Sequence, residues 1–421
     1  MKYDICVLGL GYIGLPTASI FASKGGKKVL GVDVVPRVVE TVNSGGIHIE
    51  EPGLDVLVKS VVQSGSLIAA TAPQPADVYI VAVPTPFRAT VENPRAPDLT
   101  YVESATRSIA PVVGPDALVI LESTSPVGTT EQMKTWLYDE LARLGRVSAG
   151  VEGEASLRLH FAHCPERILP GQMLKELVAN DRIVGGLTPE AAHRARELYR
   201  TFCTAEIFTT DARTAEMAKL TENSFRDVNI AFANELSLIC EKLSINVWEL
   251  IRLANRHPRV KILQPGPGVG GHCIAVDPWF IVAAASTESR LIRTAREVND
   301  AKPHHVVARV KAAAARLKSP VITCLGLAFK ADVDDLRESP AIEIVAELER
   351  DKVGRLLVVE PHARELPPQL AALPAGALVT AEEAIRQADI VLLLVNHCAF
   401  AAVDRALLRG KAVIDTRGFW E

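Results

Sequence analysis

The stretch KYDICVLGLGYIGLP, residues 2–16, decides the fold. Its apolar start predicts a buried strand at 4–8, and the strand runs directly into the motif GLGYIG. In a turn from strand to helix, Gly9 permits the tight bend, Gly11 lets a ligand approach the backbone, and Gly14 lets the helix pack on the strand. The N–H groups at such a helix start attract phosphate, so the motif predicts a dinucleotide site.

Polar residues at the ends of the next predicted strands extend this site. Asp33 ends a strand at 28–33, where a carboxylate binds the ribose hydroxyls and repels a ribose phosphate, which favours NAD over NADP. Strands at 77–83 and 117–122 lead into turns that hold Thr85 and Thr124. Ligands bind beyond the carboxyl ends of parallel strands, although an ordinary turn or helix cap explains these threonines equally well.

The rest of the chain shows two α/β regions separated by a helical one. Helices are expected at 12–24, 36–44 and 100–110, and a strand at 159–163 follows a polar, turn-rich insertion at 145–158. A second α/β pattern begins near 318. Its expected strands are 320–326, 355–360, 389–395 and 411–416.

The helical region lies between these two patterns. Residues 212–243 have helical periodicity without Pro or Gly and predict one long helix, of the kind that bridges domains or forms a dimer interface. Further helices are expected at 245–257, stopped by Pro258, and at 278–300. The predicted fold is therefore α/β, with two Rossmann-like doubly wound domains joined by a long central helix and a helical middle domain. The predicted domains are 1–205, 206–302 and 315–421.

Composition narrows the functional classes. A chain of 421 residues with 48% hydrophobic and 23% charged residues suits a globular protein of two or three domains. A net charge of -4 predicts neither nucleic acid nor an anionic membrane as partner. The seven cysteines are scattered and form no CxxC pair, which predicts no disulfide framework and no metal site, and favours the cytoplasm.

One cysteine differs from the others in its surroundings. Cys273 follows a loop, 265–272, that holds four glycines and two prolines. Such a loop exposes backbone N–H groups and admits a ligand, so this thiol is a candidate nucleophile, whereas Cys6 and Cys324 in strands are expected to be core. The adjacent His272 is not expected to act as a base.

Charged and polar residues gather at four further places, and such groups suit the binding of a diphosphate. Surface ion pairs or a solvated helix face are the alternative explanation for each group. Lys219, Asn223 and Arg226 share a face of the long predicted helix because they are spaced by four and three residues. The other three groups are Glu166 with Arg167, His257 with Arg259, and Lys330 with Arg337.

Taken together, these motifs resemble the UDP-glucose/GDP-mannose dehydrogenase family over essentially the whole chain. The matching segments are GLGYIGLP, VPTP, ESTSPVGTT, CPER, AKLTENSFRDVNIAFANELS, QPGPGVGGHCIAVDP and GLAFKADVDDLRESP, in the family's order. Residues 216–240, 246–260 and the cysteine loop look more like the branch that acts on UDP-N-acetyl-D-mannosamine. The resemblance implies two NAD-dependent oxidations of a sugar alcohol to a uronate, for a bacterial surface polysaccharide such as enterobacterial common antigen.

The resemblance also implies residue roles. Cys273 would be the nucleophile, Lys219 the proton donor or acceptor, and Asn223 a stabiliser of the oxyanion, while Glu166 or Asp277 would activate water. NAD would contact the glycines, Asp33 and also Tyr12, Ile13, Thr85, Thr124 and Arg337. The nucleotide sugar would contact Arg167, Ile168, Lys219, Asn223, Arg226, His257, Arg259, Gly270, Phe329, Lys330 and Arg417. Residues 257–259 would serve the neighbouring subunit of a homodimer.

Two positions depart from the family pattern. Arg417 stands where close relatives carry Lys, and Val276 stands where the wider family often has Lys, which disfavours UDP-glucose. The alternatives are the same chemistry on UDP-N-acetylglucosamine, UDP-N-acetylgalactosamine or UDP-glucose, a non-catalytic NAD-binding protein, or a hydroxy-acid dehydrogenase of similar layout. The last two leave the cysteine loop without a role.

Overall fold

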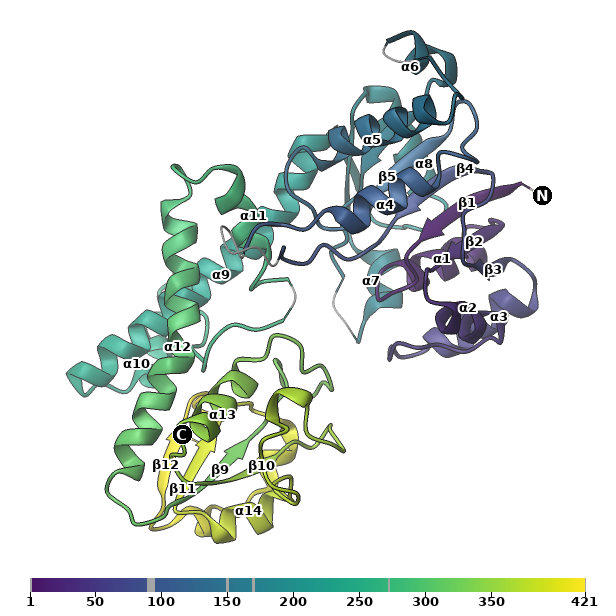
Figure 1. The fold of residues 1–421 in the computed structure, drawn as a ribbon. Coiled ribbons are helices and arrows are strands. Elements are labelled where there is room, and N and C mark those ends of the chain that lie inside the picture. Colours follow the sequence, from purple (N-terminus) through teal and green to yellow (C-terminus); the bar gives the residue numbers. More distant parts are fainter. Residues whose placement is uncertain (1, 89–94, 149–150, 169–170, 272, 421) are drawn as a thin grey trace. The chain divides into compact units, whose positions relative to one another are not determined.

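The computed structural model describes residues 2–88, 95–148, 151–168, 171–271 and 273–420. The chain divides into two compact units (Figure 1). Unit 1 consists of Met1–Glu222 and Trp279–Ala284, and unit 2 of Asn223–Pro278 and Ala285–Glu421. The boundary between the units falls inside helix α9 (Ala212–Leu243), which matches the long helix that the sequence predicts.

Unit 1 is built on an eight-stranded sheet with the order β3-β2-β1-β4-β5-β6-β7-β8. Neighbouring strands are parallel except β6 and β7, which are antiparallel. The first six strands have the doubly wound Rossmann order, in which the direction of winding changes between β1 and β4. The strands are β1 (Tyr3–Leu8), β2 (Val29–Val32), β3 (Leu67–Ala70), β4 (Ala76–Val81), β5 (Leu118–Leu121), β6 (His160–His163), β7 (Arg182–Gly186) and β8 (Ile207–Asp211).

Both faces of this sheet are buried, as in other parallel sheets. Successive side chains of β1 alternate between two apolar cores: Ile5 and Val7 belong to one, and Cys6 and Leu8 to the other. The helices of unit 1 before α9 are α1 (Gly14–Ser23), α2 (Pro36–Asn43), α3 (Leu54–Gln63), α4 (Thr100–Ser108), α5 (Thr129–Arg143), α6 (Val151–Leu157), α7 (Met173–Ala179) and α8 (Pro189–Tyr199).

Unit 2 combines helices with a smaller parallel sheet of order β10-β9-β11-β12. Its strands are β9 (Val321–Leu325), β10 (Arg355–Val359), β11 (Ile390–Leu393) and β12 (Ala412–Asp415). Its helices, besides its part of α9, are α10 (Val247–Ala254), α12 (Arg290–Ala314), α13 (Pro340–Arg350) and α14 (Ala381–Gln387), while α11 (Asp277–Ala284) crosses the unit boundary. The predicted fold class is confirmed.

Some local predictions are wrong. The helix expected at 278–300 is two helices, α11 and α12, and α12 continues past Pro303 to Ala314. Pro303 is buried and its ring lies close to Gly268, so packing outweighs the hydrogen bond that proline cannot make. The insertion at 145–158 contains the short helix α6, and strands β3, β7 and β8 were not predicted.

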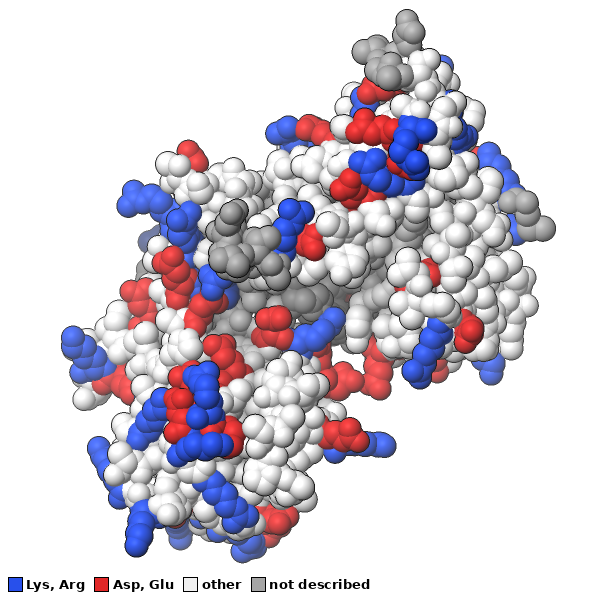
Figure 2. Space-filling view, in the orientation of Figure 1, with Lys and Arg blue, Asp and Glu red and all other residues white. Residues whose placement is uncertain are grey.

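The surface carries both signs of charge. Figure 2 shows Lys and Arg side chains interspersed with Asp and Glu side chains over the face that it presents. On unit 2, Lys311 pairs with Asp351 at 2.5 Å, and Lys352 pairs with Glu349. Within the described residues, no helix is both long and apolar enough to cross a lipid bilayer.

A buried polar network holds α9 to α12 inside unit 2. Arg296 pairs with Asp227 at 2.6 Å, and Asn299 Nδ2 donates to Asp227 Oδ1 at 2.8 Å. Asn234 Nδ2 donates to Asn299 Oδ1 at 2.9 Å, and Asn234 Oδ1 accepts from the Gly266 N–H at 2.8 Å. The network therefore also anchors the loop that leads to Cys273.

Asp227→Ala is expected to lower the free energy of unfolding by roughly 3 kcal/mol, because it removes the buried partner of the Arg296 guanidinium, which then keeps only the partly exposed Asp300. Urea denaturation followed by circular dichroism measures the change. The double variant Asp227→Leu/Arg296→Met removes both charges and should recover most of the loss. If Asp227→Ala alone unfolds like the parent protein, the pair does not stabilise the fold in this way.

Candidate functional site

The glycine-rich turn after β1 has the geometry of a phosphate-binding turn. Gly9 has a φ of +91°, and a Cβ atom on Gly9 would lie 2.6 Å from the Ala82 carbonyl oxygen. A Cβ on Gly14 would lie 1.8 Å from the Gly9 carbonyl oxygen, so α1 packs too closely on the turn for any side chain. A Cβ on Gly11 would meet nothing within 4 Å, so the backbone there faces open space. The turn therefore fits the pyrophosphate of a dinucleotide.

Asp33 is tied to this turn. Its Oδ2 accepts from the Leu10 N–H at 3.0 Å, and its Oδ1 accepts from the Val35 N–H at 2.9 Å. A carboxylate is thus held at the carboxyl end of β2, beside the glycine turn, where the ribose of a dinucleotide lies. Ile13 is the residue that precedes α1, and both Tyr12 and Ile13 are partly exposed there.

The loops after β4 and β5 are joined to each other. Thr85 Oγ1 donates to the Thr124 carbonyl oxygen at 2.6 Å. The second loop ends at α5, whose first turn is capped by the Glu216 carboxylate of α9: Glu216 accepts from the Gly128 and Thr130 N–H groups at 2.6 and 2.8 Å. Both threonines therefore lie at the carboxyl edge of the sheet on fixed loops.

A cluster of buried ionisable groups follows the ends of β5 and β6. The Tyr199 hydroxyl donates to Glu122 Oε1 at 2.6 Å, and Arg182 Nη2 lies 3.6 Å from Glu166 Oε2. Burial, together with the negative charge of Glu166, raises the pKa of Glu122 to about 7. Glu166 Oε1 accepts from the Arg167 N–H at 2.7 Å. Glu166, one of the two residues predicted to activate water, therefore lies beside the Glu122 carboxyl group, which keeps its proton near neutral pH.

Sequence reasoning missed Glu122 because it ends the apolar run ALVILE and was assigned to the strand. A charged residue at the carboxyl end of a buried strand was the available signal. Among the predicted residues nearby, Arg167 pairs with Glu222 at 2.7 Å and donates to the Asp181 carbonyl oxygen at 3.0 Å. Ile168 packs against the apolar core, and Lys219 is partly exposed on α9.

The cysteine loop lies in unit 2. The Cys273 carbonyl oxygen accepts from the Val276 and Asp277 N–H groups at 3.1 and 2.9 Å, so Cys273 begins the helical turn that leads into α11. Its side chain is partly exposed, unlike those of the core cysteines. The buried Asn223 donates from Nδ2 to Asp277 Oδ2 at 2.5 Å, which brings together two predicted catalytic residues. His272 lies outside the described residues.

The same loop packs against the C-terminal α/β part of unit 2. A Cβ on Gly270 would lie 2.4 Å from the Glu338 carbonyl oxygen, and a Cβ on Gly271, whose φ is +83°, would lie 3.0 Å from the Phe329 ring. Residues with side chains do not fit at these positions. The glycines therefore bring the thiol loop against Phe329, as the predicted substrate site requires.

The other predicted contacts fall into two groups. Arg417 lies beside the loop, since a Cβ on Gly266 would be 2.6 Å from its Nη1. Arg337 forms a two-point ion pair with Asp335, at 2.9 and 2.6 Å. The remaining predicted contacts are exposed: Arg226, His257, Arg259 and Lys330.

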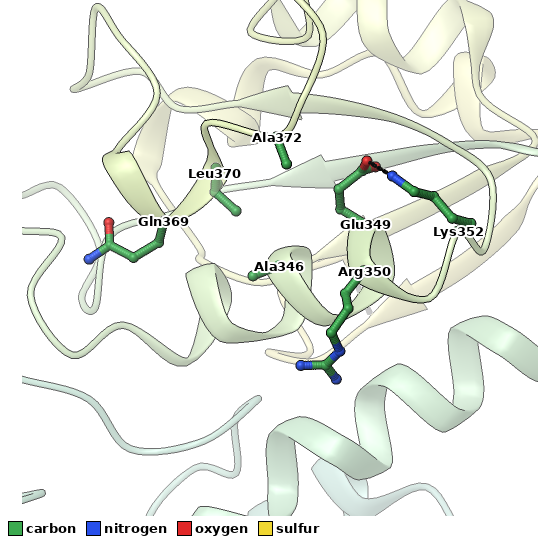
Figure 3. Close-up of a pocket in the computed structure, with 7 residues that line it drawn as sticks. All are labelled: Ala346, Glu349, Arg350, Lys352, Gln369, Leu370 and Ala372. Carbon is green, nitrogen blue, oxygen red and sulfur yellow. Dashed lines mark hydrogen bonds and ion pairs between the residues drawn. The ribbon is translucent and has the colours of Figure 1, made fainter.

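A separate hollow of about 300 Å³ lies at the end of α13 (Figure 3). Its lining is Ala346, Glu349, Arg350, Lys352, Gln369, Leu370 and Ala372, and Glu349 pairs with Lys352 across its rim. None of the predicted site residues belongs to this lining. The hollow is therefore distinct from the candidate site.

Comparison with known proteins gives matches along the chain to one family. Models of the UDP-glucose/GDP-mannose dehydrogenase family match residues 3–203 as its NAD binding domain, 213–301 as its central domain and 323–421 as its UDP binding domain. The domain that holds the glycine turn and Asp33 is therefore an NAD binding domain, in agreement with the predicted cofactor.

Individual relatives match at full length. The chain is 59% identical to the NDP-N-acetyl-D-galactosaminuronic acid dehydrogenase of Ralstonia nicotianae, over 99% of this chain and 96% of that protein. It is 55% identical to the UDP-N-acetyl-D-mannosamine dehydrogenase of Escherichia coli, over 99% of each chain. A solved UDP-D-ManNAc dehydrogenase from Pyrococcus horikoshii superposes with a TM-score of 0.88 at 40% identity, covering 100% of this chain and 96% of that one.

Glu122→Gln tests the protonated carboxyl group. Between pH 4.5 and about 7 the folded protein keeps this proton while the unfolded chain loses it, so the native carboxyl contributes stability at low pH that is lost as the pH rises. Glutamine stays neutral and can still accept from Tyr199. The melting temperature of the variant should therefore exceed that of the parent by on the order of 5 °C at about pH 8, and by much less at about pH 5.

Glu190→Gln, at an exposed position on α8, is the matched control and should show no such pH-dependent difference. Differential scanning calorimetry of the three proteins at both pH values provides the comparison. An identical difference at both pH values would contradict a protonated Glu122.

Proposed function

The chain belongs to the UDP-glucose/GDP-mannose dehydrogenase family, and we propose that it oxidises UDP-N-acetyl-D-mannosamine to UDP-N-acetyl-D-mannosaminuronate with two molecules of NAD. The observation that carries the proposal is the cysteine loop. It places a partly exposed thiol at the start of a helical turn, next to the Asn223–Asp277 pair. A protein that only bound a dinucleotide would have no use for this arrangement.

The first oxidation removes a proton and a hydride from the primary alcohol of the sugar. Lys219, directly or through water, accepts the hydroxyl proton, and NAD when bound accepts the hydride. Asn223 lies one helical turn from Lys219 on α9 and presents an amide that stabilises the developing oxyanion. The product of this step is an aldehyde.

The second oxidation requires a covalent bond to the enzyme. The Cys273 thiolate adds to the aldehyde carbon, and the thiohemiacetal then loses a hydride to a second NAD, which leaves a thioester. N–H groups at the start of a helical turn favour the thiolate over the thiol. Water, activated by Glu166 or Asp277, hydrolyses the thioester to the carboxylate and frees the thiol.

The identity of the sugar rests on the relatives. Several proteins at 55–56% identity and solved structures at 40% identity are named for UDP-N-acetyl-mannosamine. The relative at 59% identity is named for N-acetyl-D-galactosaminuronic acid, so UDP-N-acetyl-D-galactosamine is the second candidate. The use of the uronate in a surface polysaccharide of the enterobacterial common antigen type, and a cytoplasmic location, stay predictions, as does the division into domains at 1–205, 206–302 and 315–421.

The active protein is proposed to be a homodimer joined through α9. Phe225, Phe232 and Ile239 are 68%, 52% and 45% exposed, and their spacing of seven residues places them on one face of the helix. Leu243, one turn beyond Ile239 at the end of α9, is also exposed. A contiguous exposed apolar stripe indicates a protein interface, and the exposed segment 257–259 follows α10, where it would reach the partner's site.

A coupled assay with four nucleotide sugars tests the reaction. With UDP-N-acetyl-D-mannosamine the protein should form two NADH for each uronate, and its kcat/KM should exceed those for UDP-N-acetylglucosamine, UDP-N-acetylgalactosamine and UDP-glucose. Two NADH are expected because each hydride transfer consumes one NAD. A ratio of one NADH per sugar would indicate a simple alcohol dehydrogenase, and a preference for UDP-N-acetylgalactosamine would reassign the sugar.

Cys273→Ala should lose uronate formation by several orders of magnitude, because no thioester can form. Cys273→Ser should instead retain the sugar as an ester-like adduct, which the mass of the intact protein reveals. The matched control is Cys398→Ser, at an exposed cysteine outside the loop, which should keep activity. Uronate formation by Cys273→Ala at the parent rate would exclude the covalent scheme.

Phe232→Glu should convert the dimer to a monomer, because it buries a charge in the apolar interface. Light scattering after size-exclusion chromatography measures the mass. Phe208→Glu, at a similarly exposed phenylalanine on β8, is the control and should stay dimeric. A dimeric Phe232→Glu protein would place the interface elsewhere.

A further inference from the structure

We propose that the C-terminal sheet of unit 2 carries a site for a divalent transition-metal ion, formed by Asp332, His362 and His397. One ligand atom from each residue lies within 4.8 Å of the other two. Asp332 Oδ1 is 3.8 Å from His397 Nδ1 and 3.9 Å from His362 Nε2. This site is independent of the reaction proposed above.

The fold brings these three residues together. Asp332 follows β9, His362 follows β10 and His397 follows β11, and these three strands are parallel neighbours. The loops after parallel strands meet at one edge of the sheet, which is where ligands bind in such folds. Because the residues are far apart in sequence, no ligand-spacing motif announces the site.

Glu360 orients the buried histidine. One of its carboxylate oxygens, Oε2, accepts from the Leu327 and Ala328 N–H groups at 2.6 and 3.0 Å and lies 3.2 Å from His397 Nε2. A carboxylate oxygen can only accept a hydrogen bond, so the imidazole proton of His397 is on Nε2, next to Glu360. The lone pair of the ring is then on Nδ1, the atom that faces Asp332. A carboxylate behind a ligating histidine is the usual arrangement in metal sites.

The lone pair on His397 Nδ1 now accepts from the Asp332 N–H at 3.0 Å. An ion bound to His397 Nδ1 would break this hydrogen bond. The turn that carries Asp332 would then have to move away from the imidazole. The side chains of Asp332 and His362 are 43% and 37% exposed, so an ion can reach both of them from solvent. Asp332 Oδ1 and His362 Nε2 are 3.9 Å apart. This distance is slightly wider than the roughly 3.3–3.5 Å between two ligand atoms of a tetrahedral ion, each bound at about 2.0–2.1 Å.

The donor set selects the class of ion. Two imidazoles and one carboxylate suit Zn²⁺ and its neighbours Co²⁺, Ni²⁺ and Cu²⁺, whereas Mg²⁺ and Ca²⁺ prefer oxygen alone. Cys398 contacts Asp332, although its sulfur does not belong to the group of ligand atoms that lie within 4.8 Å of one another. Its N–H donates to Asp332 Oδ1 at 2.9 Å, and its Sγ lies 2.9 Å from Asp332 Oδ2. Three protein ligands also leave a coordination position for water.

Co²⁺ is the probe, because a tetrahedral Co²⁺ ion absorbs visible light and reports its own binding. The titration uses the full chain with Cys273→Ala, which removes the competing thiol of the cysteine loop. This Cys273→Ala protein is the parent and should bind one equivalent of Co²⁺, which Zn²⁺ displaces. Adding His362→Ala or Asp332→Asn to the parent should weaken Co²⁺ binding by at least roughly tenfold. Both altered side chains are solvent-accessible, and circular dichroism with EDTA present checks that the variants fold.

His304→Ala is the matched control. His304 is another exposed histidine of unit 2, with Glu347 at 2.7 Å and Glu343 at 3.9 Å, so it tests whether any histidine beside a carboxylate binds Co²⁺. It should retain the one equivalent. The proposal is overturned if the parent binds no Co²⁺, if His362→Ala and Asp332→Asn both bind it as the parent does, or if His304→Ala removes it.

Discussion

The hydrogen bond from the Gly266 N–H to Asn234 Oδ1 is the contact on which the cysteine loop depends. A segment with four glycines in eight residues loses much conformational entropy when it becomes ordered, so its position must be determined by partners outside it. Asn234 belongs to a buried chain of polar groups that continues through Asn299 to Asp227 and Arg296. Hydrogen-bonded buried polar groups allow few other arrangements, because breaking one of these bonds leaves a further donor or acceptor unpaired away from water. The start of the loop therefore takes its position from the interior of the helical part, while Gly270 and Gly271 pack against the C-terminal α/β part.

The helix that holds this loop also supplies polar anchors to unit 1. Glu216 of α9 caps the first turn of α5, and the loop before α5 holds Thr124, which accepts from Thr85. Asn223, further along α9, donates to Asp277 in unit 2. A single continuous helix thus contributes directed hydrogen bonds to the NAD binding domain and to the turn that begins at Cys273. These contacts account for Glu216 and Asn223, whereas Arg226 is exposed on α9, as expected of a solvated helix face.

The sequence predicted what local patterns determine and missed what tertiary contacts determine. The strands at 4–8 and 389–395 and the helix at 212–243 follow from periodicity and from the absence of Pro and Gly, and they agree with β1, β11 and α9. The interruption between α11 and α12 and the passage of α12 through Pro303 depend on packing against other segments. Among candidate site residues, the glycine turn and Cys273 have local signatures. Glu122 has only its place at the end of a buried strand as a signal, and the group of Asp332, His362 and His397 has none, because only the sheet brings their partners near.

Arg417 shows why equal charge does not make two residues interchangeable. Its Nε donates to the Leu394 carbonyl oxygen at 3.1 Å, just after β11, while its Nη1 lies against Gly266 of the cysteine loop. A planar guanidinium can make both contacts at once because its donors point in fixed and different directions. A lysine ammonium at the end of a flexible chain could occupy one position and would leave the other unfilled. Arg417 and Gly266 therefore form a matched pair, and the shape of the site beside the cysteine loop depends on both residues rather than on a positive charge alone.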